Sequence, residues 1–272
     1  MLLFAKSGER MRLSILIVSH GHEQLVARLL ASLPGACAGI EHEIVIVDNL
    51  GSPDFQTAIG GLTPVLKILS NDRRLGFGAN VNRAERASSG DILLVLNPDT
   101  EYVSGSLAKA SNYLESHPGI GLLAARLIHP DGRDQRNFRA FPTLPVAILR
   151  GLGADSWKKT PKFYRARVLL DMPLDVPRQV DWAFGSFMLI RRHNFEAVGG
   201  FDESFFMYYE DVDLCLRLRR QGLETWIYPN LVFLHHHQRT SAEQLVGFHR
   251  RQHLRSLANY LLRAGYLFRP PY

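Results

Sequence analysis

The sequence predicts an α/β protein built on a Rossmann-like, doubly wound and mostly parallel sheet with helices on both faces. Three observations support this class. Short continuous apolar runs, typical of strands that are buried on both faces, recur between residues 13 and 99. Segments with a helical spacing of apolar residues separate these runs. Several runs also end in polar residues, as expected where parallel strands meet a ligand-binding edge.

The first part of the chain alternates predicted strands with predicted helices. The uncharged run LSILIVS predicts a strand at 13–19. A helix is predicted at 23–33, because its leucines recur every four residues and Pro34 follows them. The runs EIVIVDN at 43–49 and VLKILSN at 65–71 predict the next two strands.

The alternation continues through a fourth strand and two more helices. A glycine turn leads into a predicted helix within 76–90, and DILLVLNPD predicts a strand at 91–99. A further helix is predicted at 104–117, because Pro118 follows it. This β-α-β-α order favours parallel strands joined by helices.

The second half of the chain has a less regular pattern. Strands are predicted at 121–135, which includes a His-Pro-Asp-Gly turn, and at 182–192. Residues 137–180 are basic and interrupted by prolines, and we expect a mobile connection with one or two short helices. Helices are predicted at 193–201 and 210–221, because each is followed or ended by glycine.

The C-terminal part is predicted to hold two short strands and a long helix. The strands correspond to TWIYPN and LVFLHHH, over residues 225–237. The helix is expected at 241–264, and Glu243 in its first turn is a capping signal.

The composition allows a sizeable core and favours an anionic partner. Hydrophobic residues make up 46% of the 272 residues, and the formal net charge is +6. Residues 137–272 carry 19 Lys and Arg against 12 acidic residues. Phosphate, a membrane surface or nucleic acid would each suit a basic half, although solubility alone also explains it.

Cysteine usage and hydropathy indicate a cytoplasmic protein. Cys37 and Cys215 are too few for a disulfide framework, which favours a reducing compartment. The first residues lack an apolar run long enough for a signal peptide. We also find no apolar stretch approaching the ~18–20 residues of a membrane-spanning helix.

Polar residues follow four of the predicted parallel strands. In an open parallel sheet, the carboxyl ends of strands lie at one edge and bind ligands there. A single Asp or Asn at a strand end also begins a turn, but several at one edge favour a ligand site. The residues are Ser19, His20, Asp48, Asn49, Asn71, Asp72, Asn97, Pro98 and Asp99.

The strand-end residues Asn97 and Asp99 suit a hard divalent cation that is shared with substrate phosphates. The same Asn-Pro-Asp triplet is also a common turn. The glycine turn at 76–80 is not a dinucleotide fingerprint, since Val81 stands where a third glycine is required. A nicotinamide cofactor is therefore not expected, and the Walker phosphate loop is absent from the sequence.

Two groups of histidines are candidate metal ligands. On a strand, His235 and His237 would share one face and His236 the other. From spacing alone, a polar turn is the preferred explanation of this run. His249 and His253 are one helical turn apart, but an exposed basic helix face is the simpler explanation.

The segment FFMYYEDVDLCLR brings three carboxylates to the edge of an aromatic cluster. Glu210, Asp211 and Asp213 stand at the start of a predicted helix, where acidic side chains stabilise the helix dipole. Alternatively, one of them is the general base for an acceptor hydroxyl. The aromatic residues, including Phe206 and Tyr208, would then bind the acceptor as a sugar-stacking platform and shield the base from water.

These motifs resemble glycosyltransferase family 2, whose members have the GT-A fold and invert the anomeric carbon. The chain is most similar to the bacterial rhamnosyltransferases of that family, which act on cell-surface glycans. The matching pieces, in family order over residues 13–241, are SILIVSHGH, EIVIVDN, NDRRLGFGANVN, DILLVLNPDT, WAFGSFMLIRR, VGGFDESFFMYYEDVDLCLRLR and LHHHQRTS. The Gly-Phe-Asp-Glu to Glu-Asp-x-Asp block is the specific one.

The resemblance implies a nucleotide-sugar donor, with dTDP or UDP as the nucleotide. Asp48 would bond the pyrimidine, and Ser19 and Asn82 would line the nucleotide pocket. His20-Gly21 stand where the family usually has Tyr-Asn, which is a departure at that contact.

The resemblance also implies a site for Mn²⁺ or Mg²⁺. Asp99 would bind the metal and the donor as the carboxylate of the D-x-D element, whose first Asp is replaced by Asn97. His235 falls where the family places a histidine that completes metal or diphosphate binding. The substitution of Asn97 leaves the site with less negative charge.

On the acceptor side, the resemblance makes Asp211 the catalytic base, with Glu210 beside it. Trp182 and Gly185 would border the acceptor, a glycan or lipid-linked saccharide. The expected reaction is direct displacement at C1 through an oxocarbenium-like transition state, without a covalent intermediate.

The resemblance divides the chain as follows. Residues 1–12 are expected to be a tail, and residues 13–240 a GT-A domain. Within it, 13–100 would bind the nucleotide and 101–240 the acceptor. The extension at 241–272 is expected to be an amphipathic helix.

That helix interleaves arginines with leucines, which favours contact with an anionic membrane surface. The alternative is that its leucines pack on the catalytic domain or on a second subunit in a homodimer. A nucleic-acid partner is not expected.

The sequence leaves alternatives open for the donor sugar and for the reaction class. L-rhamnose from dTDP-rhamnose is the best candidate, with UDP-galactofuranose or a UDP-hexose as alternatives. A sugar nucleotidyltransferase would share the nucleotide-binding half and the metal carboxylate. A non-catalytic glycan-binding protein would need neither the base nor the metal carboxylate.

Overall fold

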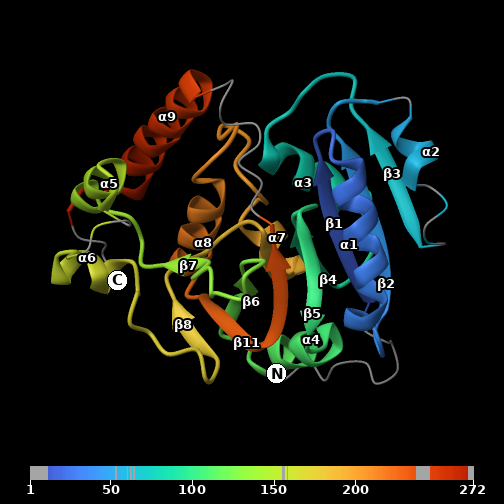
Figure 1. Cartoon of the computed structure of the whole chain (residues 1–272), viewed down its shortest axis with the longest axis horizontal. Helices are drawn as coiled ribbons and strands as arrows, with labels where there is room; N and C mark the ends of the chain where they lie inside the picture. Colours follow the sequence, from blue (N-terminus) through green and yellow to red (C-terminus); the bar gives the residue numbers. More distant parts are fainter. Residues whose placement is uncertain are drawn as a thin grey trace.

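One large sheet with helices on both faces forms the framework of the molecule (Figure 1). The computed structural model describes residues 12–52, 54–59, 61, 63, 65–154, 157, 159–236 and 246–268. The strands are β1 Arg12–Ser19, β2 Glu41–Asp48, β3 Leu66–Ser70, β4 Ile92–Leu96, β5 Thr100–Ser104, β6 Ile120–Ile128, β7 Phe138–Arg139, β8 Arg178–Val180, β9 Trp182–Ala183, β10 Phe187–Arg191 and β11 Glu224–His235. The helices are α1 Glu23–Ala36, α2 Phe55–Ile59, α3 Phe77–Arg86, α4 Leu107–Ser116, α5 Leu144–Gly151, α6 Lys162–Arg167, α7 Arg192–Ala197, α8 Glu210–Arg220 and α9 Val246–Ala264.

The main sheet is mostly parallel. Within the described residues its order is β3-β2-β1-β4-β10-β6-β11-β5, and β8 also pairs with β11. The strands β1 to β4 pair parallel with one another, and β6 is parallel to β11, whereas β5 and β8 pair antiparallel with β11. The strand β10 lies antiparallel between β4 and β6. The predicted doubly wound, mostly parallel sheet is therefore confirmed.

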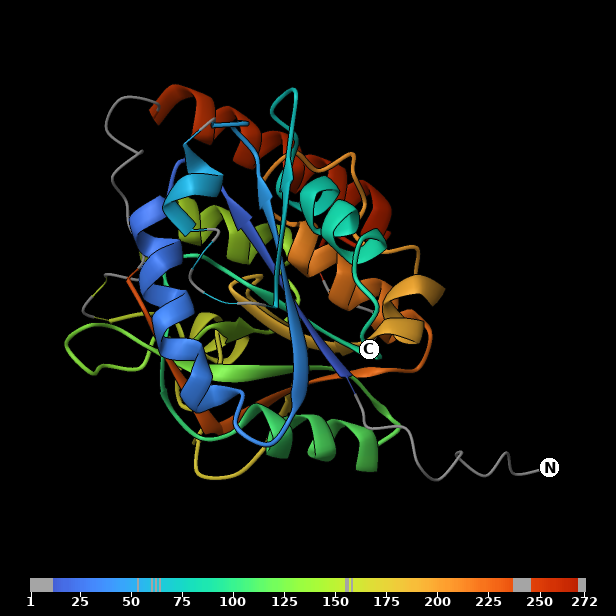
Figure 2. The same ribbon diagram turned by 90° about the vertical axis from the view of Figure 1, so that its right-hand side faces the viewer.

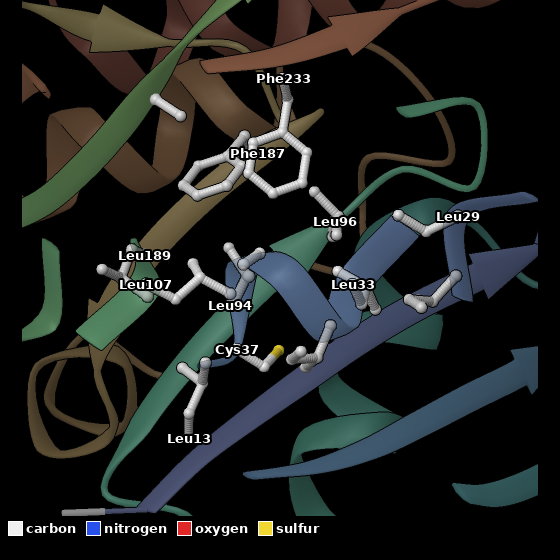
Figure 3. Close-up of a cluster of buried hydrophobic side chains, with 14 of the residues drawn as sticks. Leu13, Leu29, Leu33, Cys37, Leu94, Leu96, Leu107, Phe187, Leu189 and Phe233 are labelled. Atoms are coloured by element: carbon white, nitrogen blue, oxygen red, sulfur yellow. The ribbon is translucent and has the colours of Figure 1, made fainter. Parts of the chain in front are cut away.

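The central strands supply side chains to a hydrophobic layer on each face of the sheet. Leu13 and Ile17 of β1 belong to the layer that α1, α2 and α4 cover, whereas Leu16 belongs to the layer under α3, α7 and α8. Figure 2 shows α1 and α3 on opposite sides of β1 and β2. Leu29 and Leu33 of α1 point into the first layer (Figure 3), as their spacing predicts.

The single strand predicted at 182–192 is wrong, because the chain turns within it. The strand β9 pairs with β7 in a separate two-stranded sheet, and β10 joins the main sheet beside β4. The N–H of Phe187 donates to the carbonyl of Phe184 at 3.4 Å and closes the turn. The turn therefore carries Gly185 and Ser186 out of the strand.

The two short strands predicted near residue 230 are one strand, β11. Pro229 lies inside it, and the pairing of β11 with β6 shifts in register between Tyr228 and Val232. A bulge of this kind accommodates a proline, which has no N–H to donate. The irregularity explains why the sequence pattern breaks at this point.

The helix predicted from residue 104 begins instead at Leu107. Ser104 ends β5, and Ser106 caps α4 by accepting a hydrogen bond from the N–H of Lys109 at 3.3 Å. Gly105 connects the two with a φ of 102°, which L side chains rarely adopt.

The remaining expectations concern the connection and the two ends of the chain. The connection at 137–180 holds the short helices α5 and α6, as expected, together with β7 and β8. The helix α9 lies where the final helix is predicted, but its expected start at Ser241 and the capping Glu243 lie outside the described residues. Among the described helices, none combines the length and apolar character needed to cross a membrane.

We predict that Gly105→Ala destabilises the protein more than Gly132→Ala does. Both glycines have positive φ, at 102° and 81°. A Cβ on Gly105 would lie 2.3 Å from the carbonyl oxygen of Asn230, whereas a Cβ on Gly132 meets nothing within 4 Å. Strained backbone costs about 1–3 kcal/mol, and the Asn230 clash adds to it only at Gly105. Equal losses in the free energy of unfolding, measured in urea, would contradict the clash.

Candidate active site

The carboxyl ends of the parallel strands lie at one edge, as predicted. Ser19 at the end of β1 is in register with Asp48 at the end of β2, and Asp48 is in register with Ser70 of β3. Ser19 is fully buried, and its Oγ accepts a hydrogen bond from the N–H of His22 at 3.3 Å. The chain then leaves β1 through Gly21, whose φ is 73°. Asn and Gly both tolerate this left-handed conformation.

Asp48 shapes the loop that follows β2. Its side chain has no exposed surface, and its carboxylate accepts hydrogen bonds from the N–H groups of Leu50 at 3.0 Å and Ser52 at 2.6 Å. These bonds hold the loop in place next to the strand edge. Contact between Asp48 and a pyrimidine stays a prediction.

Three asparagines form a buried hydrogen-bond network that the sequence analysis did not identify as one unit. Asn71 donates to the side-chain oxygens of Asn49 at 2.8 Å and Asn80 at 2.6 Å. Asn49 accepts from the N–H of Leu75 at 2.9 Å, and Asn80 donates to the carbonyl of Gly76 at 2.9 Å. The network therefore fixes the loop between β3 and α3. Two of its members stand at predicted strand ends, which was the only signal in the sequence.

Asn82 on α3 bonds to the loop at 201–203, not to the strand-end residues of the predicted nucleotide pocket. Its amide donates to the carbonyl of Phe201 at 2.8 Å and to the carboxylate of Glu203 at 3.0 Å, and its oxygen accepts from the N–H of Phe201 at 2.9 Å. Among the described residues, these bonds position the loop before the aromatic segment, and none reaches Ser19 or Asp48. Lining of the nucleotide pocket by Asn82 stays a prediction.

Asp99 and His235 lie together, as their predicted shared role requires. The Nε2 atom of His235 is 3.2 Å from Oδ1 of Asp99. Gln135, which the sequence analysis missed, donates from Nε2 to the carbonyl of His235 at 2.7 Å, so its oxygen faces Nδ1 of His235 at 2.8 Å. Nδ1 must then carry a proton, and the neutral ring has its lone pair on Nε2, toward Asp99.

This pair of side chains fits a divalent cation. Two ligands of an octahedral ion at its usual bond lengths lie about 3 Å apart, close to the observed separation. A ligating histidine also usually donates its second ring N–H, as His235 does to Gln135. Within the described residues, no group of three or more His, Cys, Asp or Glu side chains could hold a metal. A bound ion would therefore need ligands from a substrate as well.

The other predicted histidines are placed differently. The ring of His236 is 2.8 Å from the carboxylate of Glu101, and its N–H donates to the carbonyl of Asp99. His236 thus pairs with β5 rather than with the carboxylate of Asp99. His237 and the side chain of His249 lie outside the described residues.

The aromatic segment reaches α8 through two strained residues. Tyr208 and Tyr209 both have positive φ, at 70° and 66°. Left-handed backbone is uncommon for aromatic residues and persists only where the surroundings enforce it. Tyr209 caps α8, and its ring packs against Tyr260 and His253 of α9 at centroid distances of 5.5 and 5.3 Å. The C-terminal helix therefore supports the residue that directs Glu210 and Asp211.

Asp211, the predicted base, is the less buried of the two carboxylates at the start of α8. It is partly exposed, and its oxygens accept hydrogen bonds from the N–H groups of Gly185 at 3.0 Å and Val212 at 2.8 Å. Burial raises the pKa of Asp211 to about 6, against these hydrogen bonds. A carboxyl with this pKa is ionised at neutral pH and remains basic enough to take a proton.

Glu210 is buried beside Asp211, and its surroundings favour its protonated form. Burial, followed by the charge of Asp211, raises its pKa to about 8. Its Oε2 has no hydrogen-bond partner within the described residues. The pair therefore holds one proton at neutral pH, on Glu210.

Asp213 is a structural residue. Its carboxylate accepts from Nε of Arg217 at 2.7 Å, and Arg217 in turn donates to the carbonyls of Val198 and Gly200 at 2.5 and 2.7 Å. Burial raises the pKa of Asp213, and Arg217 opposes that rise. The third carboxylate of the segment thus fastens α8 to the loop after α7.

The turn between β9 and β10 connects the base to the Asp99 loop. Gly185 donates to Asp211, and the carbonyl of the next residue, Ser186, accepts from the N–H of Asn97 at 3.1 Å. Asn97 thereby lies next to this turn, two residues before Asp99. One turn thus links the predicted base to Asn97, one of the three predicted metal ligands.

The predicted acceptor residues differ in exposure. Trp182 is mostly buried, stacks on Phe184 at 5.2 Å and donates to the carbonyl of Ala140 at 3.0 Å. Phe206 is 36% exposed and contacts Phe248 of α9. An acceptor could therefore stack on Phe206 more readily than on Trp182.

Comparison with known proteins identifies relatives along almost the whole chain. The family model described as glycosyl transferase family 2 matches residues 14–198, and that of the N-terminal domain of galactosyltransferase matches residues 171–241. The rhamnosyltransferase WbbL of Escherichia coli strain K12 is 32% identical over 266 residues, which cover 92% of each chain. The N-acetylglucosaminyl-diphospho-decaprenol L-rhamnosyltransferase of Mycobacterium tuberculosis strain H37Rv is 30% identical over 235 residues, covering 82% of this chain and 76% of that protein.

Solved structures with the same fold are more distant in sequence. The mannosyltransferase PcManGT from Pyrobaculum calidifontis, in complex with GDP-Man and Mn²⁺, has a TM-score of 0.64 at 18% identity, over 94% of this chain and 65% of that one. The structure of GalNAc-T7 with UDP, GalNAc and Mn²⁺ has a TM-score of 0.60 at 16% identity, over 86% of this chain and 45% of that one. These matches confirm the expected GT-A fold.

We predict that Glu210→Gln changes how stability depends on pH. The folded pKa of Glu210 is raised, so between about 4.5 and about 8 the folded state keeps a proton that the unfolded state has lost. The free energy of unfolding of the wild type therefore falls as pH rises through this window. The variant has no carboxyl group at this position, so its free energy of unfolding does not fall in this way. Thermal unfolding should therefore show that the stability of the variant, relative to that of the wild type, increases with pH. The exposed control Glu196→Gln should show no such trend, and a flat difference for Glu210→Gln would contradict the protonated state.

Proposed function

The chain belongs to glycosyltransferase family 2, and on this premise we propose that it is an inverting enzyme with a nucleotide-diphosphate sugar as donor. The acceptor is a hydroxyl group of a cell-surface glycan or a lipid-linked saccharide. The observation that carries this proposal is the turn at 185–186, which bonds to Asp211 through the N–H of Gly185 and to Asn97, two residues before Asp99, through the carbonyl of Ser186. An inverting transfer needs a base on the acceptor side and charge stabilisation on the donor side.

In this mechanism Asp211 orients the acceptor hydroxyl and takes its proton. The hydroxyl oxygen forms a bond to C1 of the sugar while the bond from C1 to the diphosphate oxygen breaks, and the electron pair leaves with the diphosphate. The N–H of Gly185 holds the carboxylate of Asp211 in position for this step. Glu210, protonated beside it, avoids a second charge that would make the base harder to ionise.

We assign the metal site to Asp99, Asn97 and His235, with Mn²⁺ or Mg²⁺ as the ion. When bound, the ion would neutralise charge that develops on the departing diphosphate. Gln135 supports this site by fixing the tautomer of His235. The remaining ligands would be phosphate oxygens of the donor.

The donor assignment is L-rhamnose from dTDP-rhamnose, because the two relatives that match most of the chain are named as rhamnosyltransferases. Ser19, Asp48 and Asn82 are assigned to the donor side, at the strand edge and on α3. UDP-galactofuranose or a UDP-hexose is the alternative donor. A screen of these sugar nucleotides for hydrolysis and for thermal stabilisation distinguishes them, and formation of a sugar nucleotide from a sugar phosphate would instead indicate a nucleotidyltransferase.

The acceptor assignment follows the relative that is named for a diphospho-decaprenol substrate. A lipid-linked acceptor requires the enzyme to work at a membrane surface, and α9 suits such contact. One side of α9 packs on the catalytic domain through Tyr260 and Ser256, and the other side exposes Leu254 and Leu262. The helix can therefore pack on the catalytic domain and contact a membrane at the same time. We assign the protein to the cytoplasmic face of a membrane.

We predict that Asp211→Asn lowers turnover by about 10²–10⁴-fold while donor affinity is kept, because the amide has the same size and cannot accept the proton. The neighbouring change Glu210→Gln should keep most of the turnover at neutral pH, since Glu210 is already protonated there. In the wild type, turnover should rise with pH up to about 6, the pKa to which burial raises Asp211, and then level off. Steady-state kinetics across pH measure all three, and a larger loss in Glu210→Gln than in Asp211→Asn would reverse the assignment.

We predict that Gln135→Leu weakens Mn²⁺ binding by about 10–100-fold, because His235 loses the partner that fixes its tautomer. Asp99→Ala should weaken both Mn²⁺ and donor binding further, whereas His236→Ala should have little effect. Titration of free Mn²⁺ by electron paramagnetic resonance, with dTDP present, measures the affinity directly. Full activity in EDTA, or unchanged Mn²⁺ affinity in both Asp99→Ala and Gln135→Leu, would remove the metal from this site.

A further inference from the structure

Exposed apolar side chains gather on one part of the molecule. Nine of the fourteen large hydrophobic residues that are exposed among the described residues lie within segments 144–163 and 246–268. They are Ile148, Leu152, Trp157, Phe163, Phe248, Leu254, Leu262, Leu267 and Phe268. These segments contain α5, α6 and α9, which lie along one side of the molecule, at the left of Figure 1. A concentration of this kind marks an interaction surface.

The same segments are strongly basic. Residues 144–167 contain six Lys or Arg and one Asp, and residues 246–268 contain four Arg and no acidic residue. Arg250, Arg251 and Arg255 are exposed on α9, and Arg150 is exposed on α5. Apolar side chains flanked by cations suit the boundary between the headgroups and the acyl chains of a bilayer.

The three helices belong to one structural unit rather than to a loose connection. Val146 of α5 packs with Tyr164 of α6, and the N–H of Leu144 donates to the carbonyl of Leu267, just after α9, at 2.7 Å. Between them lies a groove of about 510 Å³, which is lined mainly by apolar side chains. Phe163 and Phe268, 53% and 67% exposed, line this groove. Contact of such a groove with water is unfavourable, and an apolar environment would stabilise it.

The unit also adjoins the candidate active site. Ser256 of α9 donates to the carbonyl of Met207, four residues before Asp211, at 2.8 Å. The positive charge of Arg150 on α5 opposes the rise that burial causes in the pKa of Asp211, which places α5 on the acceptor side. A surface that docks through this unit would bring the base close to it.

We propose that α5, α6 and α9 together form a docking surface for an anionic lipid bilayer, with the apolar residues of α5 inserting beside those of α9. The inference rests on the proposed lipid-linked acceptor and extends the membrane contact to α5 and α6. Charge selects the bilayer over a second copy of the chain, because two such basic surfaces would repel each other, whereas anionic headgroups attract them.

The experiment measures co-sedimentation of the full chain with vesicles of phosphatidylcholine alone and with added phosphatidylglycerol. The wild type should bind only the anionic vesicles, and high salt should abolish binding. The double variant of Ile148→Ser with Leu152→Ser should bind at least about tenfold more weakly, because its insertion area is lost. Arg251→Gln with Arg255→Gln should also weaken binding. The control, Val103→Ser with Val176→Ser, changes exposed residues elsewhere and should bind like the wild type.

Two results overturn the proposal. One is wild-type binding by the Ile148 and Leu152 double variant, which would leave α9 as the only contact. The other is a wild type that stays in the supernatant at low salt, and light scattering would then show whether the surface forms a dimer. Hydrolysis of dTDP-rhamnose in solution is measured in parallel and should be unchanged in the α5 variant. Failure of all sugar nucleotides would reject the proposed function without altering the vesicle result.

Discussion

The carboxylate pair at the start of α8, in which Glu210 is buried and Asp211 is partly exposed, is the constraint on which the rest of the site depends. Two neighbouring carboxylates cannot both be ionised cheaply in a largely desolvated position. Their surroundings give the two carboxyl groups different protonation states. Asp211 accepts backbone hydrogen bonds at a helix N-terminus, which favours its ionised form, whereas Glu210 stays protonated. The left-handed backbone of Tyr208 and Tyr209 sets the direction in which both enter the site, and α9 packs against these tyrosines. The C-terminal helix thus supports the segment that carries both carboxylates.

The antiparallel strand β10 couples this pair to the donor side. It lies beside β4, and the turn before it donates to Asp211 and accepts from Asn97. An in-line displacement requires that the attacking hydroxyl and the leaving diphosphate hold a defined relative position. In the proposed mechanism, the short turn that bonds to both Asp211 and Asn97 would help to fix that position.

Hydrogen-bonded side chains hold the loops around the predicted donor site. The network of Asn49, Asn71 and Asn80 holds the loop that precedes α3, and Gln135 orients His235 toward Asp99. Buried polar groups of this kind stabilise one arrangement when all are satisfied. Under the proposed metal assignment, phosphate oxygens of the substrate would complete the coordination of the ion.

The sequence alone determined the alternation of strands and helices as far as β4, the polar strand ends and the acidic start of α8. These features depend on periodicity and on neighbours within a few residues, which local patterns encode. Only the tertiary structure decided that Gln135 orients His235, that Asp213 serves Arg217 and that a turn divides the strand predicted at 182–192. Gln135 and His235 are a hundred residues apart, and their contact depends on how β6 and β11 pair and on where the chain leaves them. Strand order of this kind is settled by the packing of the whole sheet, which no local pattern specifies.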